Sequence, residues 1–132
     1  MDKVEKFEDL DAWKLARDLT RDIYRVTSSG KFNTDFALRD QIRRATISIS
    51  SNIAEGFERN GDKEFLQFLA VAKGSCGEVR SQLYVALDQN YLSQDEFVAI
   101  NGKLCETSQI ISGLIKYLHQ SELKGSKFKW KP

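Results

Sequence analysis

The chain has 132 residues, a formal net charge of +1 and two cysteines. This length is typical of one domain that buries roughly two-thirds of its unfolded surface. The near-zero net charge provides no long-range attraction to nucleic acid or membranes, and no apolar run approaches the roughly 18 residues of a membrane span. The charged N-terminus lacks an apolar signal region, and neither cysteine lies in a CxxC motif. We therefore expect reduced thiols in a cytoplasmic protein.

The first helical pattern covers residues 10–27. Its apolar residues recur at alternating spacings of four and three, which places them on one stripe: Ala12, Ala16, Leu19, Ile23 and Val26. Trp13 and Tyr24 are expected at the edges of this stripe. Asp9 or Asp11 is expected to accept a hydrogen bond from the first turn as its N-cap. Residues 28–35 are predicted to form a loop.

The second helix is predicted over residues 38–59, with Thr34 or Asp35 as the preceding cap. Between Ala45 and Ala54 it carries no charge, although 30% of the chain is charged. A surface helix would place charged residues on one face, so other helices should surround this one. Gly56, Asn60 and Gly61 are expected to mark where the helix frays or turns. The predicted core stripe is Leu38, Ile42, Ala45, Ile49, Ile53 and Phe57.

The third helix is predicted from residue 62 to about residue 89, and the fourth ends near residue 122. Gly74 and Gly77 interrupt the third helix, at a cost of roughly 1 kcal/mol each, which suggests a close contact between helices. Ser93 and Glu96 have the spacing of a capping box at the start of the fourth helix. The two predicted core stripes are Phe65, Leu69, Ala72, Cys76, Val79, Leu83 and Ala86, then Phe97, Ile100, Leu104, Thr107, Ile111, Leu114 and Leu118.

Four amphipathic helices joined by short loops predict an all-α fold, an antiparallel up-down-up-down four-helix bundle. At about 1.5 Å per residue, the third and fourth helices would be roughly 40 Å long, so the bundle should be a rod. We expect the bundle to occupy residues 1–122 and a basic, aromatic tail to occupy residues 123–132.

Three motifs occur together in this chain. Leu-x-x-Trp-x-x-Ala begins at Leu10, and Phe-x-x-Phe-Leu-x-x-Ala-x-Gly-Ser-x-x-Glu begins at Phe65. Between them, Gln41 begins Gln-x-Arg-Arg-Ala, followed by Ser-Ile-x-x-Asn-Ile-Ala-Glu-Gly ending at Gly56. Over about residues 7–120 the chain resembles the 23S rRNA intervening-sequence proteins, a family of bacterial four-helix bundles. The resemblance implies a homopentamer of antiparallel bundles, but little biochemistry.

The residues argue against an enzyme, and we expect no catalytic site, metal or cofactor. His119 is the only histidine, whereas a di-iron bundle uses two Glu-x-x-His pairs and a zinc site needs more His and Cys ligands. His119 should also lie far from Cys76 along the rod, which excludes a Cys–His pair. No Gly-rich phosphate loop is present. His119 is therefore interpreted as an exposed residue at a helix end.

One polar set is a candidate oligomer interface or internal network: Arg43, Arg44, Ser48, Asn52, Ala54, Glu55, Gly74 and Glu78. An anion site on its arginines is the alternative, but neighbouring carboxylates leave a surplus of only one positive charge. The tail is the better candidate for contact with RNA or DNA, because lysines alternate there with aromatic rings that can stack on bases: Lys127, Phe128, Lys129, Trp130 and Lys131. The alternative for the tail is a disordered, solubilising end.

Two functions remain open at this point. The first is a nonenzymatic, oligomeric binding or scaffold protein that contacts structured RNA or DNA. The second is an accessory subunit of another protein such as a reverse transcriptase, as distant relatives of the family are for diversity-generating retroelements. The second faces of the two central helices carry small residues, including Ser50 and Ala70, and are predicted to form a subunit interface. Arg44 and Glu78 are candidates for a polar pair across it.

Overall fold

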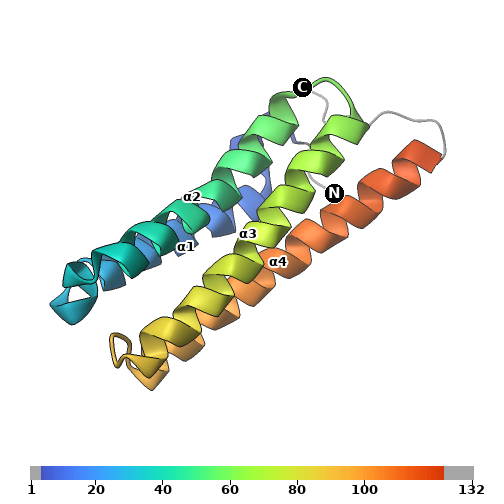
Figure 1. Cartoon of the computed structure of the whole chain (residues 1–132). Helices are drawn as coiled ribbons and strands as arrows, with labels where there is room; N and C mark the ends of the chain where they lie inside the picture. Colours follow the sequence, from blue (N-terminus) through green and yellow to red (C-terminus); the bar gives the residue numbers. More distant parts are fainter. Residues whose placement is uncertain (1–3, 124–132) are drawn as a thin grey trace.

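The structure is a computed structural model that describes residues 4–123, with the side chains of residues 4–120. Its elements are, in order, η1 (Phe7–Asp9), α1 (Asp11–Thr27), η2 (Gly30–Thr34), α2 (Phe36–Glu58), α3 (Asp62–Asp88) and α4 (Gln94–Leu123). Successive α-helices lie side by side and run in opposite directions along a rod (Figure 1). The predicted all-α four-helix bundle is confirmed, and the two longest helices, α3 and α4, extend about 40–45 Å at about 1.5 Å per residue.

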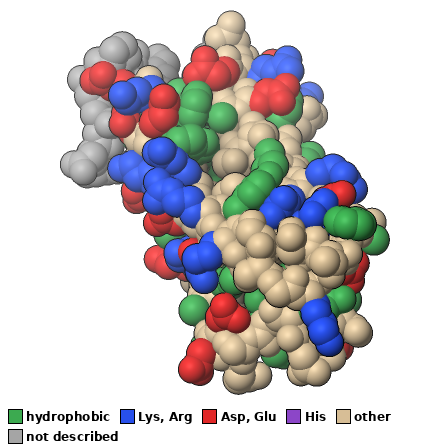
Figure 2. Space-filling view, turned by 90° about the vertical axis from the view of Figure 1, so that its left-hand side faces the viewer, with side chains coloured by type: hydrophobic (Ala, Val, Ile, Leu, Met, Phe, Trp, Pro, Cys, Tyr) green, Lys and Arg blue, Asp and Glu red, His purple; other side chains and the backbone are tan. Residues whose placement is uncertain are grey.

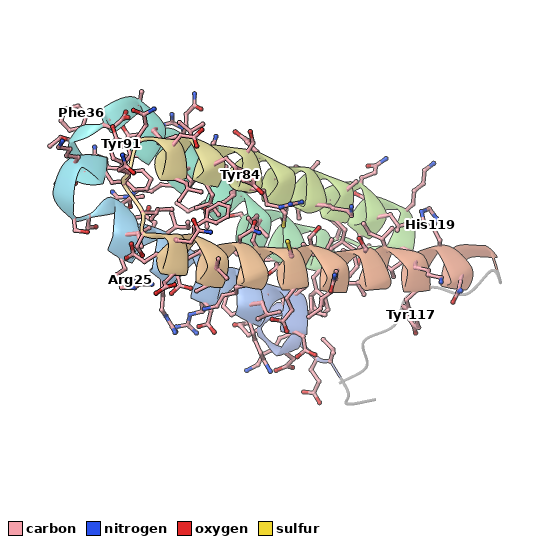
Figure 3. All side chains as sticks on the ribbon, turned by 90° about the horizontal axis from the view of Figure 1, so that it is seen from below. Arg25, Phe36, Tyr84, Tyr91, Tyr117 and His119 are labelled. Atoms are coloured by element: carbon pink, nitrogen blue, oxygen red, sulfur yellow. The ribbon has the colours of Figure 1, made fainter. Side chains whose placement is uncertain are left out.

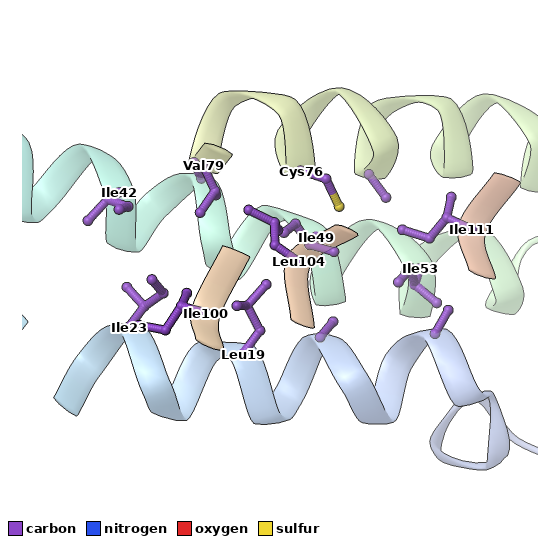
Figure 4. Packing of buried hydrophobic residues seen from close by; sticks show 14 of the residues in the cluster. Leu19, Ile23, Ile42, Ile49, Ile53, Cys76, Val79, Ile100, Leu104 and Ile111 are labelled. Carbon is purple, nitrogen blue, oxygen red and sulfur yellow. The ribbon is translucent and has the colours of Figure 1, made fainter. Parts of the chain in front are cut away.

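The predicted stripes form the core. Every stripe residue of α1 and α3 is buried, and in α2 and α4 only Leu38, Phe57 and Leu114 are half-buried. Apolar side chains from all four helices meet along the axis, among them Leu19 of α1, Ile49 of α2, Cys76 of α3 and Leu104 of α4 (Figure 4). Burial of these stripes supplies the main driving force for folding, because apolar area leaves water along the whole rod.

Buried threonines do not disturb this core. Thr27, Thr46 and Thr107 are fully buried, and each hydroxyl donates to the carbonyl four residues earlier in its own helix, at 2.7–2.8 Å. A buried hydroxyl without a partner would cost about 1–3 kcal/mol, and these bonds remove that cost. The stretch around Thr46 is therefore compatible with a helix despite its β-branched residues.

The two helical hairpins are joined by side chains at the end of the rod where both of their turns lie (Figure 1). Asp35 caps α2, since its Oδ1 accepts from the Leu38 N–H at 3.1 Å. The sequence leaves Thr34 and Asp35 as the two candidates for this cap. Its Oδ2 accepts from the Tyr91 hydroxyl at 2.9 Å, which raises the pKa of Tyr91. Phe32 is fully buried and stacks on Tyr91 at 5.2 Å between ring centres. The predicted loop thus contains the short helix η2.

The helix starts show one wrong and one correct prediction. Neither Asp9 nor Asp11 caps α1: Leu10 occupies the cap position and makes no side-chain bond there. The Asp9 carboxylate instead accepts from the Glu5 N–H at 3.2 Å, because η1 turns the chain immediately before α1. The capping box of α4 is confirmed, with Ser93 and Glu96 joined by reciprocal bonds of 3.0 and 3.1 Å.

Glycine positions show where the helices approach most closely. Asn60 and Gly61 lie in the turn between α2 and α3, as predicted, whereas Gly56 lies inside α2 and is buried, so the prediction is wrong for Gly56. A Cβ added to Gly56 would lie 2.7 Å from the Phe68 Cβ and 2.9 Å from the Phe65 Cδ1, so α3 packs directly on its backbone. Gly74 and Gly77 have open space around them. The close contact predicted at these two residues does not occur within the chain.

Candidate functional site

The structure divides the predicted polar set among three places, and the first is the α1–α2 contact. The Arg43 Nε donates to Thr27 Oγ1 at 2.8 Å, and an Nη donates to Ser28 Oγ at 3.0 Å. The guanidinium carbon lies 4.4 Å from the centre of the Tyr24 ring, within the range of a cation–π interaction. Arg43 therefore holds the C-terminal end of α1 against α2.

The second place is the α2–α3 contact. The Asn52 side-chain amide donates to the Ser48 carbonyl at 2.7 Å and to its hydroxyl at 2.9 Å. Ser75 of α3 donates to the same Ser48 hydroxyl at 3.0 Å, and the Gln82 amide donates to Glu78 at 3.2 Å. Only the bond from Ser75 to Ser48 and a longer one from the Gln82 amide to Gln41, at 3.4 Å, cross between the two helices, which otherwise meet through apolar residues. The predicted internal network thus exists for Ser48 and Asn52.

The remaining charged residues of the set lie at the surface. Glu55 is exposed and pairs with Arg59 in the next turn at 3.0 Å. Arg44 is exposed, and within the described residues it forms no salt bridge with Glu78. Pairing of Arg44 with Glu78 across a subunit interface stays a prediction.

The outer face of α3 is uncharged over about four turns. We define the α3 outer face by six exposed residues on the side of the helix opposite its buried stripe: Ala70, Gly74, Gly77, Ser81, Tyr84 and Val85. The Tyr84 ring also packs on Phe97 of α4, at 4.9 Å between ring centres, and the exposed Lys73, Glu78 and Arg80 flank this face. Tyr84 and Val85 are 48% and 45% exposed, and no atom lies within 4 Å of a Cβ built on either glycine. An exposed helix face normally carries charged residues, and large apolar side chains gathered on a surface typically mark an interaction site.

The outward side of α2 continues this uncharged character. Ile47 is 41% exposed. Ala54 lies about two turns further along the helix and is half-buried. Ser50 is predicted to belong to a subunit interface, but in the structure it lines an open space next to α1 together with Thr20 and Tyr24. Ser50 therefore belongs to the α1 side of α2 and not to its outward side.

The groups that could support catalysis lie apart. His119 is exposed on α4 at the end of the rod remote from Tyr91 (Figure 3). Cys76 is buried in the core, and burial raises its pKa to about 11, so the thiolate needed for nucleophilic attack is disfavoured. Among the described side chains, no three His, Cys, Asp or Glu residues are grouped as metal ligands. No helix in the described part of the chain has the length and hydropathy needed to cross a bilayer.

The residues predicted to contact nucleic acid in the tail, Lys127 to Lys131, lie outside the described residues.

Comparison with known proteins identifies the family of this chain. The sequence profile described as 23S rRNA-intervening sequence protein matches residues 8–113, which is most of the chain. The chain belongs to the 23S rRNA-intervening sequence protein family. No curated protein matches it. The family membership confirms the resemblance carried by the motifs at Leu10, Gln41 and Phe65.

One solved structure similar to this chain is that of a protein with unknown function from Bacteroides thetaiotaomicron VPI-5482. That protein is from the S23 ribosomal protein family. It is 20% identical, the TM-score is 0.73, and the match covers 80% of this chain and 98% of that chain. At this identity the likeness shows the fold alone. A bundle of the 23S rRNA-intervening sequence protein family is thus established, and its activity has to be argued from its surfaces.

Proposed function

We propose that this protein is a nonenzymatic homo-oligomer that assembles through the outer faces of α2 and α3 and serves as a nucleic-acid-binding scaffold. The observation that carries the proposal is the α3 outer face, where charge is absent from a fully accessible surface over about four turns. Small residues there allow another backbone to approach closely, while Tyr84 and Val85 supply apolar area. A face of this kind is stable in water when a second subunit covers it.

The geometry of the two faces favours a ring. The α3 outer face and the outward side of α2 near Ile47 differ in composition, so contact between them would be head-to-tail. Head-to-tail contacts produce a closed ring when the rotation between subunits closes. The number five rests on the family resemblance, which implies a pentamer.

The nucleic-acid part of the proposal has weaker and separate support. The family is described by its link to intervening sequences of 23S rRNA. The tail alternates lysines with Phe128 and Trp130, a composition that can neutralise phosphates and stack on bases. Repetition of one weak site around an oligomer would increase the overall affinity through avidity.

The assembly is tested by adding a charge at an exposed glycine. Gly74→Glu places a carboxylate on the α3 outer face, and Gly102→Glu places one on α4, where a Cβ also has open space. Size-exclusion chromatography with light scattering should find the wild type at about five times the chain mass of 15.1 kDa. Gly74→Glu should reduce the mass to that of one chain with unchanged helicity, and Gly102→Glu should not.

Two outcomes would contradict the proposed interface. A wild-type protein that stays at 15.1 kDa at micromolar concentration would show that the face is not covered by a second copy. Equal dissociation by Gly74→Glu and Gly102→Glu would show that any added charge separates the subunits, and that α3 has no special role. The Gly74 position is preferable to Ala54→Glu, because Ala54 is half-buried and its replacement would also strain the single chain.

The nucleic-acid part is tested on nuclease-treated protein. The full chain should bind a labelled RNA in a salt-dependent manner, because phosphate contacts release counterions. Deletion of residues 125–132 should leave the melting temperature unchanged and reduce retention on RNA, if the tail supplies the contact. Absence of RNA binding by the full chain at low salt would refute this part and leave the assembly intact.

A further inference from the structure

An open groove of about 320 Å³ lies between α1 and α2. Five residues of α1 and one of α2 line it: Trp13, Arg17, Thr20, Arg21, Tyr24 and Ser50. The α1 residues recur at spacings that place them on one face of the helix, beside the buried stripe. From Trp13 to Tyr24 the groove follows α1 for about 16 Å, at about 1.5 Å per residue.

The groove is positively charged. Its lining includes two arginines and no carboxylate, and Arg43 lies beside it against Tyr24. Arg17 forms no salt bridge among the described residues. Its guanidinium carbon lies 5.8 Å from the centre of the Trp13 ring, near the outer limit of about 6 Å for a cation–π contact. The N–H groups of Arg17 are therefore free to meet an anion.

Arg21 can also serve a ligand. It pairs with Asp18 at 3.0 Å, but both side chains are more than half exposed, at 64% and 51%. Exposed pairs of this kind contribute little, so a phosphate can replace the Asp18 carboxylate as partner. The other flank of α1 differs, because Asp22 binds Lys103 of α4 at 2.7 Å and Arg25 at 3.4 Å. A carboxylate thus lies on the α4 side of α1, whereas the groove lining contains none.

Two aromatic rings stand in this basic groove. Trp13 is half-buried, and the edge contact with Phe7, at 5.2 Å between ring centres, holds its orientation. Tyr24 is 39% exposed and is held under Arg43. The Arg43 guanidinium covers one face of the Tyr24 ring, so only the other face can meet a base. Rings held in place offer flat surfaces without the entropic cost of ordering them on binding. Figure 2, which shows the left-hand side of the molecule in Figure 1, has Lys and Arg side chains on this side with Asp and Glu side chains among them.

We propose that the α1–α2 groove binds single-stranded nucleic acid, with bases against Trp13 and the open face of Tyr24 and phosphates on Arg17 and Arg21. Stacking on aromatic side chains within a basic groove is the usual means of binding single strands, and a duplex would hide the base faces. A length of about 16 Å suits roughly four or five stacked nucleotides at about 3.4 Å each. This inference rests on the nucleic-acid part of the proposed function and locates it away from the tail.

The two tryptophans allow a direct test. Trp13 lies in the groove and Trp130 lies in the tail, and the chain has no others. Trp130→Phe leaves Trp13 as the only tryptophan of an otherwise complete chain. Titration of this variant with a 12-nucleotide oligouridine should quench its fluorescence. The oligouridine concentration at half-saturation should equal the one found by fluorescence anisotropy with the same oligonucleotide carrying an end label. A duplex of equal length should bind more weakly.

Arg17→Gln and Arg25→Gln form a matched pair, because each removes one positive charge from α1. Arg17 faces the groove, whereas Arg25 lies on the other flank beside Asp22. Arg17→Gln should weaken oligouridine binding roughly tenfold, and should reduce the slope of log K against log salt concentration by about 0.7 for the lost phosphate contact. Arg25→Gln should leave both quantities near those of the wild type.

The outcomes separate the two proposals. If the full chain gives no anisotropy change at low salt, nucleic-acid binding fails as a whole. If oligouridine binds while Trp13 fluorescence is unchanged, and Arg17→Gln equals Arg25→Gln, the groove is not the site and the tail remains responsible. If Arg17→Gln instead changes the mass in light scattering, the groove is a contact between subunits and the inference is wrong.

Discussion

Replacement of Gly56 by alanine tests the packing of α2 on α3. The added Cβ would lie 2.7 Å from the Phe68 Cβ and 2.9 Å from the Phe65 Cδ1. The nearer atom is attached directly to the backbone, so the clash is relieved only if the helices separate. Overpacking of this kind costs about 1–3 kcal/mol, and the higher helix propensity of alanine returns about 1 kcal/mol. We expect a net loss of up to about 2 kcal/mol of unfolding free energy.

This loss is measured by thermal and urea unfolding, followed by circular dichroism at one protein concentration. For a chain of this size, at about 4 °C per kcal/mol, it should lower the melting temperature by up to roughly 8 °C. Gly113→Ala is the matched control, since it adds the same methyl group to an exposed helix position with open space. It should raise the unfolding free energy by up to about 1 kcal/mol. The packing argument is wrong if Gly56→Ala is as stable as Gly113→Ala.

Three further predictions concern other contacts. The bond to Asp35 raises the pKa of Tyr91, so the stability that this bond supplies should be present below about pH 10, the usual Tyr pKa, and lost as the pH rises through the higher folded value. Unfolding midpoints of Tyr91→Phe should lack this dependence. Cys105, which is half-buried, should react with a disulfide reagent at pH 8 in the folded protein, whereas Cys76 should react only after unfolding. Arg43→Lys should cost about 1–2 kcal/mol in urea unfolding, because lysine cannot bond Thr27 and Ser28 together while stacking on Tyr24.

Periodic features were predictable from the sequence, because a helix repeats its environment every few residues. The core stripes of α1 and α3 follow directly from spacings of three and four, and all their residues are buried. The Ser93–Glu96 box is also local, since both partners lie within one turn. These features depend on nothing outside their own helix.

Contacts between distant segments could not be predicted in this way. Phe32 is a single apolar residue in a polar loop, and its partner Tyr91 lies in the other hairpin, so no periodicity indicates its burial. Gly56 looked like a helix end, because a glycine in sequence does not reveal whether a neighbour is packed on it.

The candidate site shows the same limit. The angular grouping on α2 correctly placed Ser48 and Asn52 together, but it could not show that Arg43 would turn to α1. Trp13 and Tyr24 were predicted at the edges of the α1 stripe, and the structure confirms this. Their position in a basic groove depends on the rotation of α2 against α1, which helical periodicity leaves undetermined.

The joining of the two turns by Asp35 and Tyr91 has a consequence for local opening of the bundle. The chain connects the two hairpins covalently between α2 and α3, at the end of the rod opposite these turns (Figure 1). At the turn end the bond from Tyr91 to Asp35 and the stacking on Phe32 help to hold the hairpins together. These contacts at the turn end are noncovalent, whereas the opposite end is joined by the chain itself. We therefore expect transient separation of the hairpins to begin near Tyr91, where amide hydrogens should exchange first, and to reach the Gly56 contact last.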